Sequence, residues 1–122
     1  MYHRSVLELL IVVGLVVAAF MVAAVPWASL LMAGMLTTAA GLVFGLATGL
    51  WYHIALARAL VARRALLPRW WLRPVSLHGR LDTAGQRRVM PWFYAGAAGF
   101  VVTVVGLALA ALGVAAVTVS GR

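Results

Sequence analysis

The sequence contains no cysteine, no lysine and only two acidic residues, Glu8 and Asp82, among its 122 residues. Without cysteine the chain has no disulfide, no thiolate nucleophile, and no zinc or iron–sulfur site built on thiolates. Charged residues make up 10% of the chain, whereas soluble domains carry about 25%. This deficit argues against an ordinary soluble domain and is typical of a chain whose solvent is lipid.

Three long apolar runs occupy most of the sequence, which is 66% hydrophobic with a mean hydropathy of +1.07. The second run, 27–57, contains no charged residue. About 20 apolar residues already cross a hydrocarbon core about 30 Å thick. The sequence therefore predicts an all-α integral membrane protein with one membrane domain, 1–122, and three transmembrane helices at about 5–25, 28–57 and 92–119.

The first run could be a signal peptide, but it extends over 6–25 and carries Glu8 near its start. Signal peptides have shorter apolar regions of about 7–15 residues, so we interpret it as the first span. Pro26 and Trp27 separate it from the second run. Proline suits a break between helices or the first turn of a new one. A connection this short predicts a tight antiparallel hairpin of the first two helices.

A basic loop, 58–91, separates the second and third spans. It holds eight of the ten arginines and one aspartate, a net charge of +7. Loops rich in arginine stay on the cytoplasmic side of a membrane. We therefore expect a bacterial inner-membrane protein with a cytoplasmic amino terminus and a periplasmic carboxyl terminus, where Arg122 lies. No nucleic-acid-binding motif accompanies the basic residues, so nucleic acid is not an expected partner.

Within the loop, one short helix is expected. Thr83 and Gln86 have the spacing of a capping box, so Asp82-Thr83 should begin a short interfacial helix. The second helix should continue past its span until Pro68 ends it. Pro91 is placed for the first turn of the third span. The sequence thus predicts two separate helices on either side of Pro91.

Two rows of glycine are expected to form helix-packing faces. The rows are Gly41, Gly45 and Gly49, four residues apart, and Gly99, Gly106 and Gly113, seven residues apart. Small residues at such spacing let helix backbones approach closely in a membrane. One row could serve packing within the chain and the other an outside partner, and the sequence leaves open which.

Arginine and tryptophan alternate in and around the loop, and we expect these residues to contact anionic lipid or a partner protein. Tryptophan favours the membrane interface, and arginine is attracted to anionic headgroups. Both residue types are also enriched at protein interfaces. The candidate interface residues are Arg69, Trp70, Trp71, Arg73, Arg87, Arg88 and Trp92.

His53 and Glu8 are the ionisable residues that could carry chemistry near the spans. His53 follows Gly49 by four residues, so it could be a ligand of haem b or contact a quinone. It could equally be an interfacial histidine with an ordinary hydrogen bond. Glu8 could belong to an ion pathway, but it lies one turn after Arg4, which favours an interfacial ion pair.

The leading hypothesis is a small, non-catalytic accessory subunit of a larger bacterial membrane complex. The expected partners are other integral membrane subunits and bound anionic lipid, with no resident cofactor or metal. The first alternative is a haem- or quinone-associated anchor subunit of an electron-transport complex that uses His53. Further alternatives are a homo-oligomeric pore such as a phage holin, and a transporter that depends on Glu8.

Overall fold

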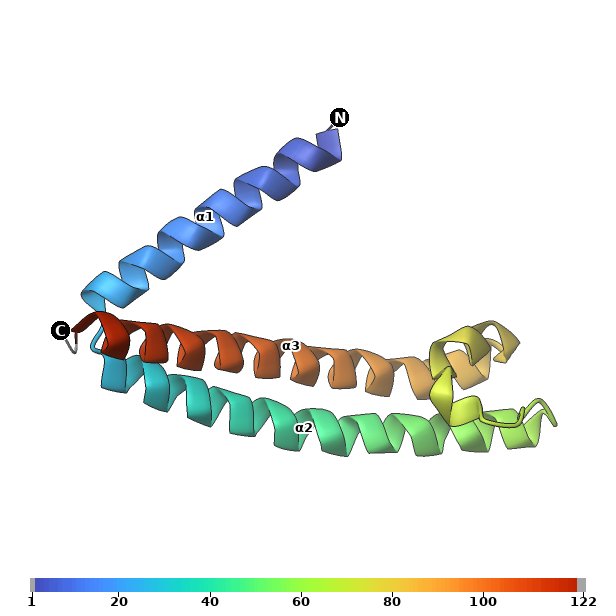
Figure 1. The fold of residues 1–122 in the computed structure, drawn as a ribbon. Helices are drawn as coiled ribbons and strands as arrows, with labels where there is room; N and C mark the ends of the chain where they lie inside the picture. The colour runs from blue at the N-terminus through green and yellow to red at the C-terminus, as the bar shows by residue number, and fades with distance from the viewer. Residues whose placement is uncertain (1, 121–122) are drawn as a thin grey trace. The chain divides into compact units, whose positions relative to one another are not determined.

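The computed structural model describes residues 2–120, so Arg122 lies outside the described residues. The elements are α1 (Tyr2–Ala24), α2 (Trp27–Ala62), two short 3₁₀ helices, η1 (Trp70–Leu72) and η2 (Pro74–Arg80), and α3 (Thr83–Ser120) (Figure 1). In this part of the chain three helices are long and apolar enough to cross a membrane: His3–Ala24, Trp27–Ala62 and Thr83–Ser120. The prediction of an all-helical chain with three potential spans is confirmed.

α1 presents apolar side chains all round, and its residues 3–17 are exposed on the surface of the chain. Near its start, Nε of Arg4 lies 3.7 Å from Oε1 of Glu8, so the expected ion pair is present. Only residues 25 and 26 separate α1 from α2. The carbonyl of Pro26 accepts hydrogen bonds from the backbone N–H groups of Ser29 and Leu30, which begins α2. The hairpin of these two helices stays a prediction.

The chain divides into two compact units, and segments of α2 and α3 contribute to each. One unit comprises the residues up to Thr38 and from Val104 onwards. In it, the two helices approach so closely that a Cβ on glycine would meet the backbone opposite. The contacts join Gly34 to Ala110, Gly106 to Thr38, and Gly113 to Leu31. These helix segments are therefore antiparallel and packed backbone against backbone.

The other unit, Ala39–Thr103, contains the rest of both helices and the loop between them. Gly45 faces Gly99, and Gly41 faces Thr103. A Cβ on Gly99 would lie 2.5 Å from Cα of Gly45, which is closer than any real contact. Here too the segments lie side by side and antiparallel (Figure 1).

Threonine hydroxyls inside the spans bond to their own helix. Thr38 donates to the carbonyl of Gly34, Thr48 to that of Phe44, and Thr103 to that of Gly99, at 2.7–2.9 Å. A polar group in hydrocarbon needs such a partner because no water is available. Among the described residues, no buried side-chain nitrogen or oxygen lacks a hydrogen bond.

α2 ends at Ala62, earlier than the predicted limit at Pro68. The N–H of Ala65 bonds to the carbonyl of Leu60, and that of Arg64 to the carbonyl of Val61. This pair of bonds is a Schellman motif, in which the residue after the cap adopts a left-handed conformation. Arg64 takes that position with φ of 53°. The last carbonyls of α2 are thus hydrogen-bonded within the chain at Arg64 and Ala65, and the helix ends before Pro68 is reached.

α3 corrects the prediction of two helices separated at Pro91. One continuous helix runs through Thr83–Ser120 with Pro91 inside it. Proline fixes φ at a helical value, but it lacks the N–H that would bond to the carbonyl four residues earlier, and its ring crowds that carbonyl. That carbonyl belongs to Arg87, an exposed residue. The predicted interfacial helix is therefore the first part of the third span's helix.

The predicted capping box is also wrong. Oδ1 of Asp82 accepts a hydrogen bond from the N–H of Gly85 at 2.7 Å, so Asp82 is the cap in place of Thr83. The side chain of Gln86 extends toward the carbonyl of His78, 3.5 Å away. An aspartate before the first turn is as good a cap as threonine and also suits the positive end of the helix dipole.

Candidate functional site

The polar chemistry of the chain gathers in residues 51–94, which we call the head. It comprises the end of α2, the loop with η1 and η2, and the start of α3. A small apolar core holds these segments together. Its buried members are Tyr52, Leu56 and Leu60 from α2, Leu77 and Leu81 from the loop, and Val89 from α3. Leu56, Leu60 and Val89 have no exposed surface, so the loop is folded onto both helices.

A hydrogen bond between α2 and η2 lies at the edge of this core. The hydroxyl of Tyr52 is 2.5 Å from Nε2 of His78. The ring of Phe93 lies 5.5 Å from that of Tyr52 and 5.1 Å from that of His78, measured between centroids. Burial among these groups lowers the pKa of His78 below its ordinary value. The tautomer of the neutral imidazole decides which of the two groups donates this hydrogen bond.

His53, the predicted ligand, hydrogen-bonds within its own helix. Its Nδ1 donates to the carbonyl of Gly49 at 2.8 Å. Its ring lies 5.9 Å from that of Trp70. Both residues line an apolar pocket of about 500 Å³, with Leu50, Ile54, Ala57, Arg58 and Trp71. His53 and His78 do not share a ligand position, because Nε2 of His78 is engaged by Tyr52.

Trp51 on α2 and Trp92 on α3 lie at the same level along the two helices. Their rings meet edge to face, with centroids 5.9 Å apart. Cζ of Arg58 lies 5.8 Å from the centroid of the Trp51 ring, within cation–π range. Paired tryptophans on adjacent spans are typical of the membrane interface.

The neighbouring residues Trp70 and Trp71 have different surroundings. Trp70 is half-buried against the apolar core, whereas Trp71 is 59% exposed. Leu72 and Val75 continue the exposed apolar surface, at 58% each. Arg69 and Arg73 are exposed beside them, and Arg69 has a left-handed backbone with φ of 58°. We call these five exposed residues, Arg69, Trp71, Leu72, Arg73 and Val75, the loop surface.

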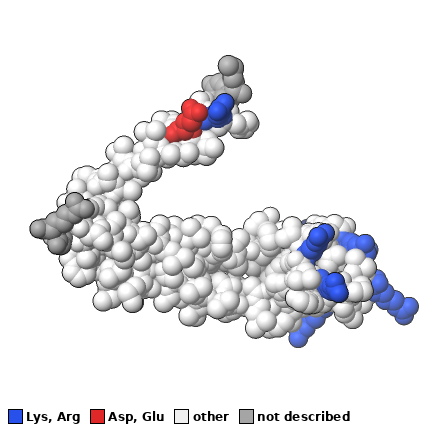
Figure 2. Space-filling model, in the orientation of Figure 1, with Lys and Arg blue, Asp and Glu red and all other residues white. Residues whose placement is uncertain are grey.

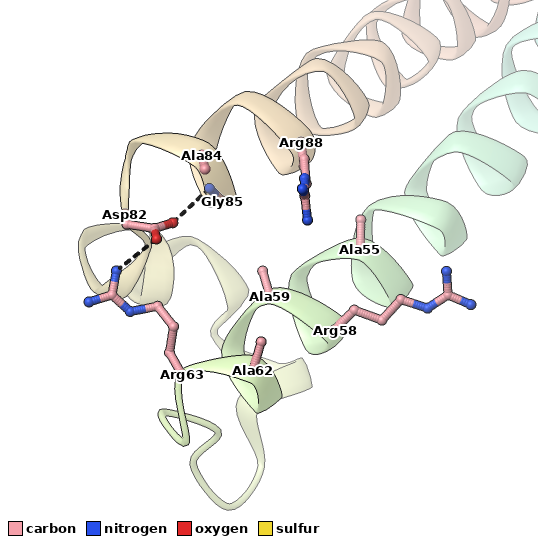
Figure 3. Close-up of a pocket in the computed structure, with 9 residues that line it drawn as sticks. All are labelled: Ala55, Arg58, Ala59, Ala62, Arg63, Asp82, Ala84, Gly85 and Arg88. Atoms are coloured by element: carbon pink, nitrogen blue, oxygen red, sulfur yellow. Dashed lines mark hydrogen bonds and ion pairs between the residues drawn. The ribbon is translucent and has the colours of Figure 1, made fainter.

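A second, basic pocket of about 350 Å³ opens between α2 and the start of α3 (Figure 3). Its α2 side is lined by Ala55, Ala59 and Ala62, and its α3 side by Ala84 and Gly85. Arg58, Arg63 and Arg88 surround it together with Asp82. Nη1 of Arg63 lies 3.5 Å from Oδ2 of Asp82. Figure 3 shows Arg88 extending from α3 toward the alanines of α2.

The other predicted interface residues are distributed over the head. Arg87 and Trp92 are exposed on α3, and Arg87 borders a shallow apolar hollow with Pro91 and Tyr94. Figure 2 shows the arginine side chains gathered over the loop and the adjoining helix ends. Among the glycines, Gly49 differs from the rest of its row, since a Cβ there would meet nothing within 4 Å.

The sequence did not reveal several residues that build the head. The Tyr52–His78 bond and the roles of Arg58, Arg63 and Asp82 in the basic pocket were not predicted. A signal existed for the core, because Leu56 and Leu60, and also Leu77 and Leu81, are spaced by four residues. In an α-helix such spacing puts both members of a pair on one face, as for Leu56 and Leu60. Leu77 lies in a 3₁₀ helix and Leu81 follows its end, and the prolines at 68 and 74 made this segment look irregular.

Comparison of the chain with protein-family models, with curated proteins and with solved structures finds no match. The functional reasoning therefore depends on the head itself.

Proposed function

We propose that the chain is a small, non-catalytic subunit of a larger bacterial inner-membrane complex, with its head on the cytoplasmic side. The observation that carries this proposal is the loop surface. Trp71, Leu72 and Val75 expose more than half of their surface beside two arginines. Aromatic residues and arginine are enriched at the centres of protein interfaces.

The spans favour the same function. Their threonine hydroxyls bond to carbonyls of their own helices, and glycines bring α2 against α3 within each unit. Helices built in this way supply packing and are consistent with a scaffold role. The cytoplasmic position of the head follows the arginine distribution, with eight of ten in the loop segment 58–91.

Purification from the native membrane tests the proposal. The tagged full chain would be extracted in mild detergent, and the proteins that accompany it identified and quantified by mass spectrometry. We expect one or more integral membrane subunits in fixed stoichiometry. Recovery of the chain alone, in a homogeneous preparation, would overturn the proposal.

A matched pair of variants connects the result to the loop surface. Trp71→Ala combined with Arg73→Gln should reduce the recovery of partners several-fold, since hot-spot truncations cost at least about 2 kcal/mol. Arg80→Gln, at an exposed position of η2 outside the loop surface, should leave recovery unchanged. Equal loss in both variants would indicate general attraction by positive charge instead of a defined surface.

A second candidate function is a quinone- or haem-associated anchor subunit that uses His53. The observation that favours it is the orientation of the ring. Nδ1 of His53 bonds to the carbonyl of Gly49, and Nε2 is the atom left for a ligand. Histidines that bind metals commonly hold their second nitrogen in this way. The apolar pocket of about 500 Å³ beside the ring has the size of a small-molecule site.

Two measurements test this candidate. A haem Soret band in the purified protein, lost in His53→Gln, would support haem. A quinone found by chromatography of an organic extract, and reduced in amount by the same variant, would support a quinone site. A colourless protein whose extract contains no quinone would refute this second function.

A further inference from the structure

The basic pocket contains one cation for which the described structure records no partner. Arg63 pairs with Asp82, and Arg58 lies over the ring of Trp51. No ion pair, hydrogen bond or ring contact is recorded for Arg88 among residues 2–120, although Arg88 extends into the space between the helices (Figure 3). A guanidinium so placed presents its donors to whatever enters the pocket.

The pocket is kept open by small side chains. Ala55 and Ala59 line it on α2, and Ala84 and Gly85 line it on α3. Any larger residue at Ala59 would occupy the space into which Arg88 extends. A volume of about 350 Å³ lies at the lower end of the range for small-molecule sites. It accommodates a compact headgroup.

The charge of the pocket favours an anion. Three arginines and one aspartate leave a net charge of +2. Asp82 caps α3 through the N–H of Gly85 and pairs with Arg63, so its carboxylate is engaged within the chain. The guanidinium group matches the oxygens of phosphate in a two-pronged arrangement.

The pocket lies close to the level of the interface. Arg88 precedes Trp92 by one helical turn, about 6 Å along the axis, and Trp92 pairs with Trp51. Phosphate groups of lipids lie just outside the hydrocarbon boundary that tryptophans mark. This placement depends on the proposed spans but requires no partner subunit.

We propose that the basic pocket binds one phosphate ester of an anionic headgroup, with Arg88 as the principal contact. In the bound state Arg63 shares its donors between Asp82 and the phosphate, and Arg58 closes the side near Trp51. The ligand chemistry is the same for a lipid headgroup and for a soluble phosphate ester.

Native mass spectrometry of the full chain in a non-ionic detergent tests the site. Phosphatidylglycerol and phosphatidylcholine would be titrated separately, and the fraction of chain with one bound lipid measured. We expect one phosphatidylglycerol bound at least tenfold more tightly than phosphatidylcholine. Equal affinity for the two lipids would overturn the proposal, because both carry a phosphate but only one has a net negative charge.

Arg88→Gln and Arg80→Gln form a matched pair, since each removes one positive charge from an exposed position of the head. Loss of the charged hydrogen bonds in Arg88→Gln should weaken binding about tenfold. Arg80→Gln should change it less than twofold, because Arg80 does not line the pocket. Equal weakening in the two variants would show a diffuse charge effect and overturn the site.

Ala59→Leu fills the pocket without changing charge. We expect it to abolish binding while the chain keeps its helical circular dichroism. Should this variant misfold, the arginine pair still decides the question. Glycerol 3-phosphate, added at millimolar concentration, tests whether the ligand is an intact lipid or a soluble phosphate ester. Displacement of the lipid supports a site for the phosphate ester alone, and retention that still depends on Arg88 supports a site for the intact lipid.

Discussion

The hydroxyl of Tyr52 and Nε2 of His78, 26 residues apart in the chain, lie 2.5 Å from each other and connect a spanning helix to the loop that follows it. The bond lies against the ring of Phe93, at the start of α3. It therefore joins three segments of the head. Together with the apolar core, it holds the loop on the two helices.

The stability of the head should decrease in acid because of His78. Burial lowers the pKa of this imidazole in the folded state below the ordinary value of 6.5. As the pH falls below 6.5, the unfolded loop therefore binds more protons than the folded one. The contribution of the neutral imidazole to the free energy of unfolding is complete above pH 6.5 and decreases below that pH. Thermal melts of the chain in detergent at pH 7.5 and 5.0 should show this difference, and His78→Gln should flatten it. A pH dependence that persists in His78→Gln would contradict the explanation.

Tyr52→Phe should weaken the head even at pH 7.5. The variant removes a hydroxyl that pairs with His78 and leaves the ring packed against Phe93. Loss of one such bond costs about 0.5–1.5 kcal/mol. Hydrogen exchange of the backbone amides in 74–81 reports the local effect. We expect faster exchange there and unchanged exchange in the middle of α2, whereas uniform acceleration would indicate a global defect.

Gly99→Ala should separate α2 from α3. The added Cβ would lie 2.5 Å from Cα of Gly45, and backbone atoms cannot move aside as a flexible side chain can. We expect a loss of about 1–3 kcal/mol, the usual cost of overpacking. Gly49→Ala is the control, since its Cβ meets nothing within 4 Å. Chemical denaturation in detergent should distinguish the two variants. Equal free energies of unfolding would refute the close contact between Gly99 and Gly45.

Arg64→Gly should stabilise the chain. Arg64 has a left-handed backbone, φ 53°, at the end of α2. Glycine adopts this conformation without the cost of about 1 kcal/mol that a side chain imposes, although it also gains freedom when unfolded. A small rise in melting temperature is therefore expected. Arg63→Gly should give no such gain, because Arg63 precedes the left-handed residue and pairs with Asp82.

Labelling from outside the cell tests the proposed orientation. The sequence has no cysteine, so single cysteines can be introduced at will. Ser76→Cys lies in η2 and Thr118→Cys near the end of α3, both at exposed positions. A membrane-impermeant maleimide should label position 118 in intact cells and position 76 only after lysis. The reverse pattern would place the head outside.

The spans were predictable from sequence because lipid imposes a simple requirement, a long apolar helix, that any chain must satisfy. The helix ends were harder to place. α2 stops at Ala62 through bonds from Arg64 and Ala65, and no glycine or proline marks that position. Pro91 suggested a boundary, yet α3 passes through it, because the φ that proline fixes is a helical one and the carbonyl left without its bond belongs to an exposed residue.

The head was less predictable than the spans because it depends on contacts between distant segments. Leu77 and Leu81 are buried against α2 and α3, although the sequence around them has the prolines of a surface loop. The basic pocket combines arginines from both sides of that loop. Local patterns identified the arginines but gave no indication of which would face one another.

The composition of the apolar core has a consequence for biogenesis. Its residues come from α2, from the loop and, last, from Val89 in α3. During synthesis the loop therefore has no complete core to fold against until the ribosome has reached α3. The head therefore completes its fold only once the start of α3 is available to it.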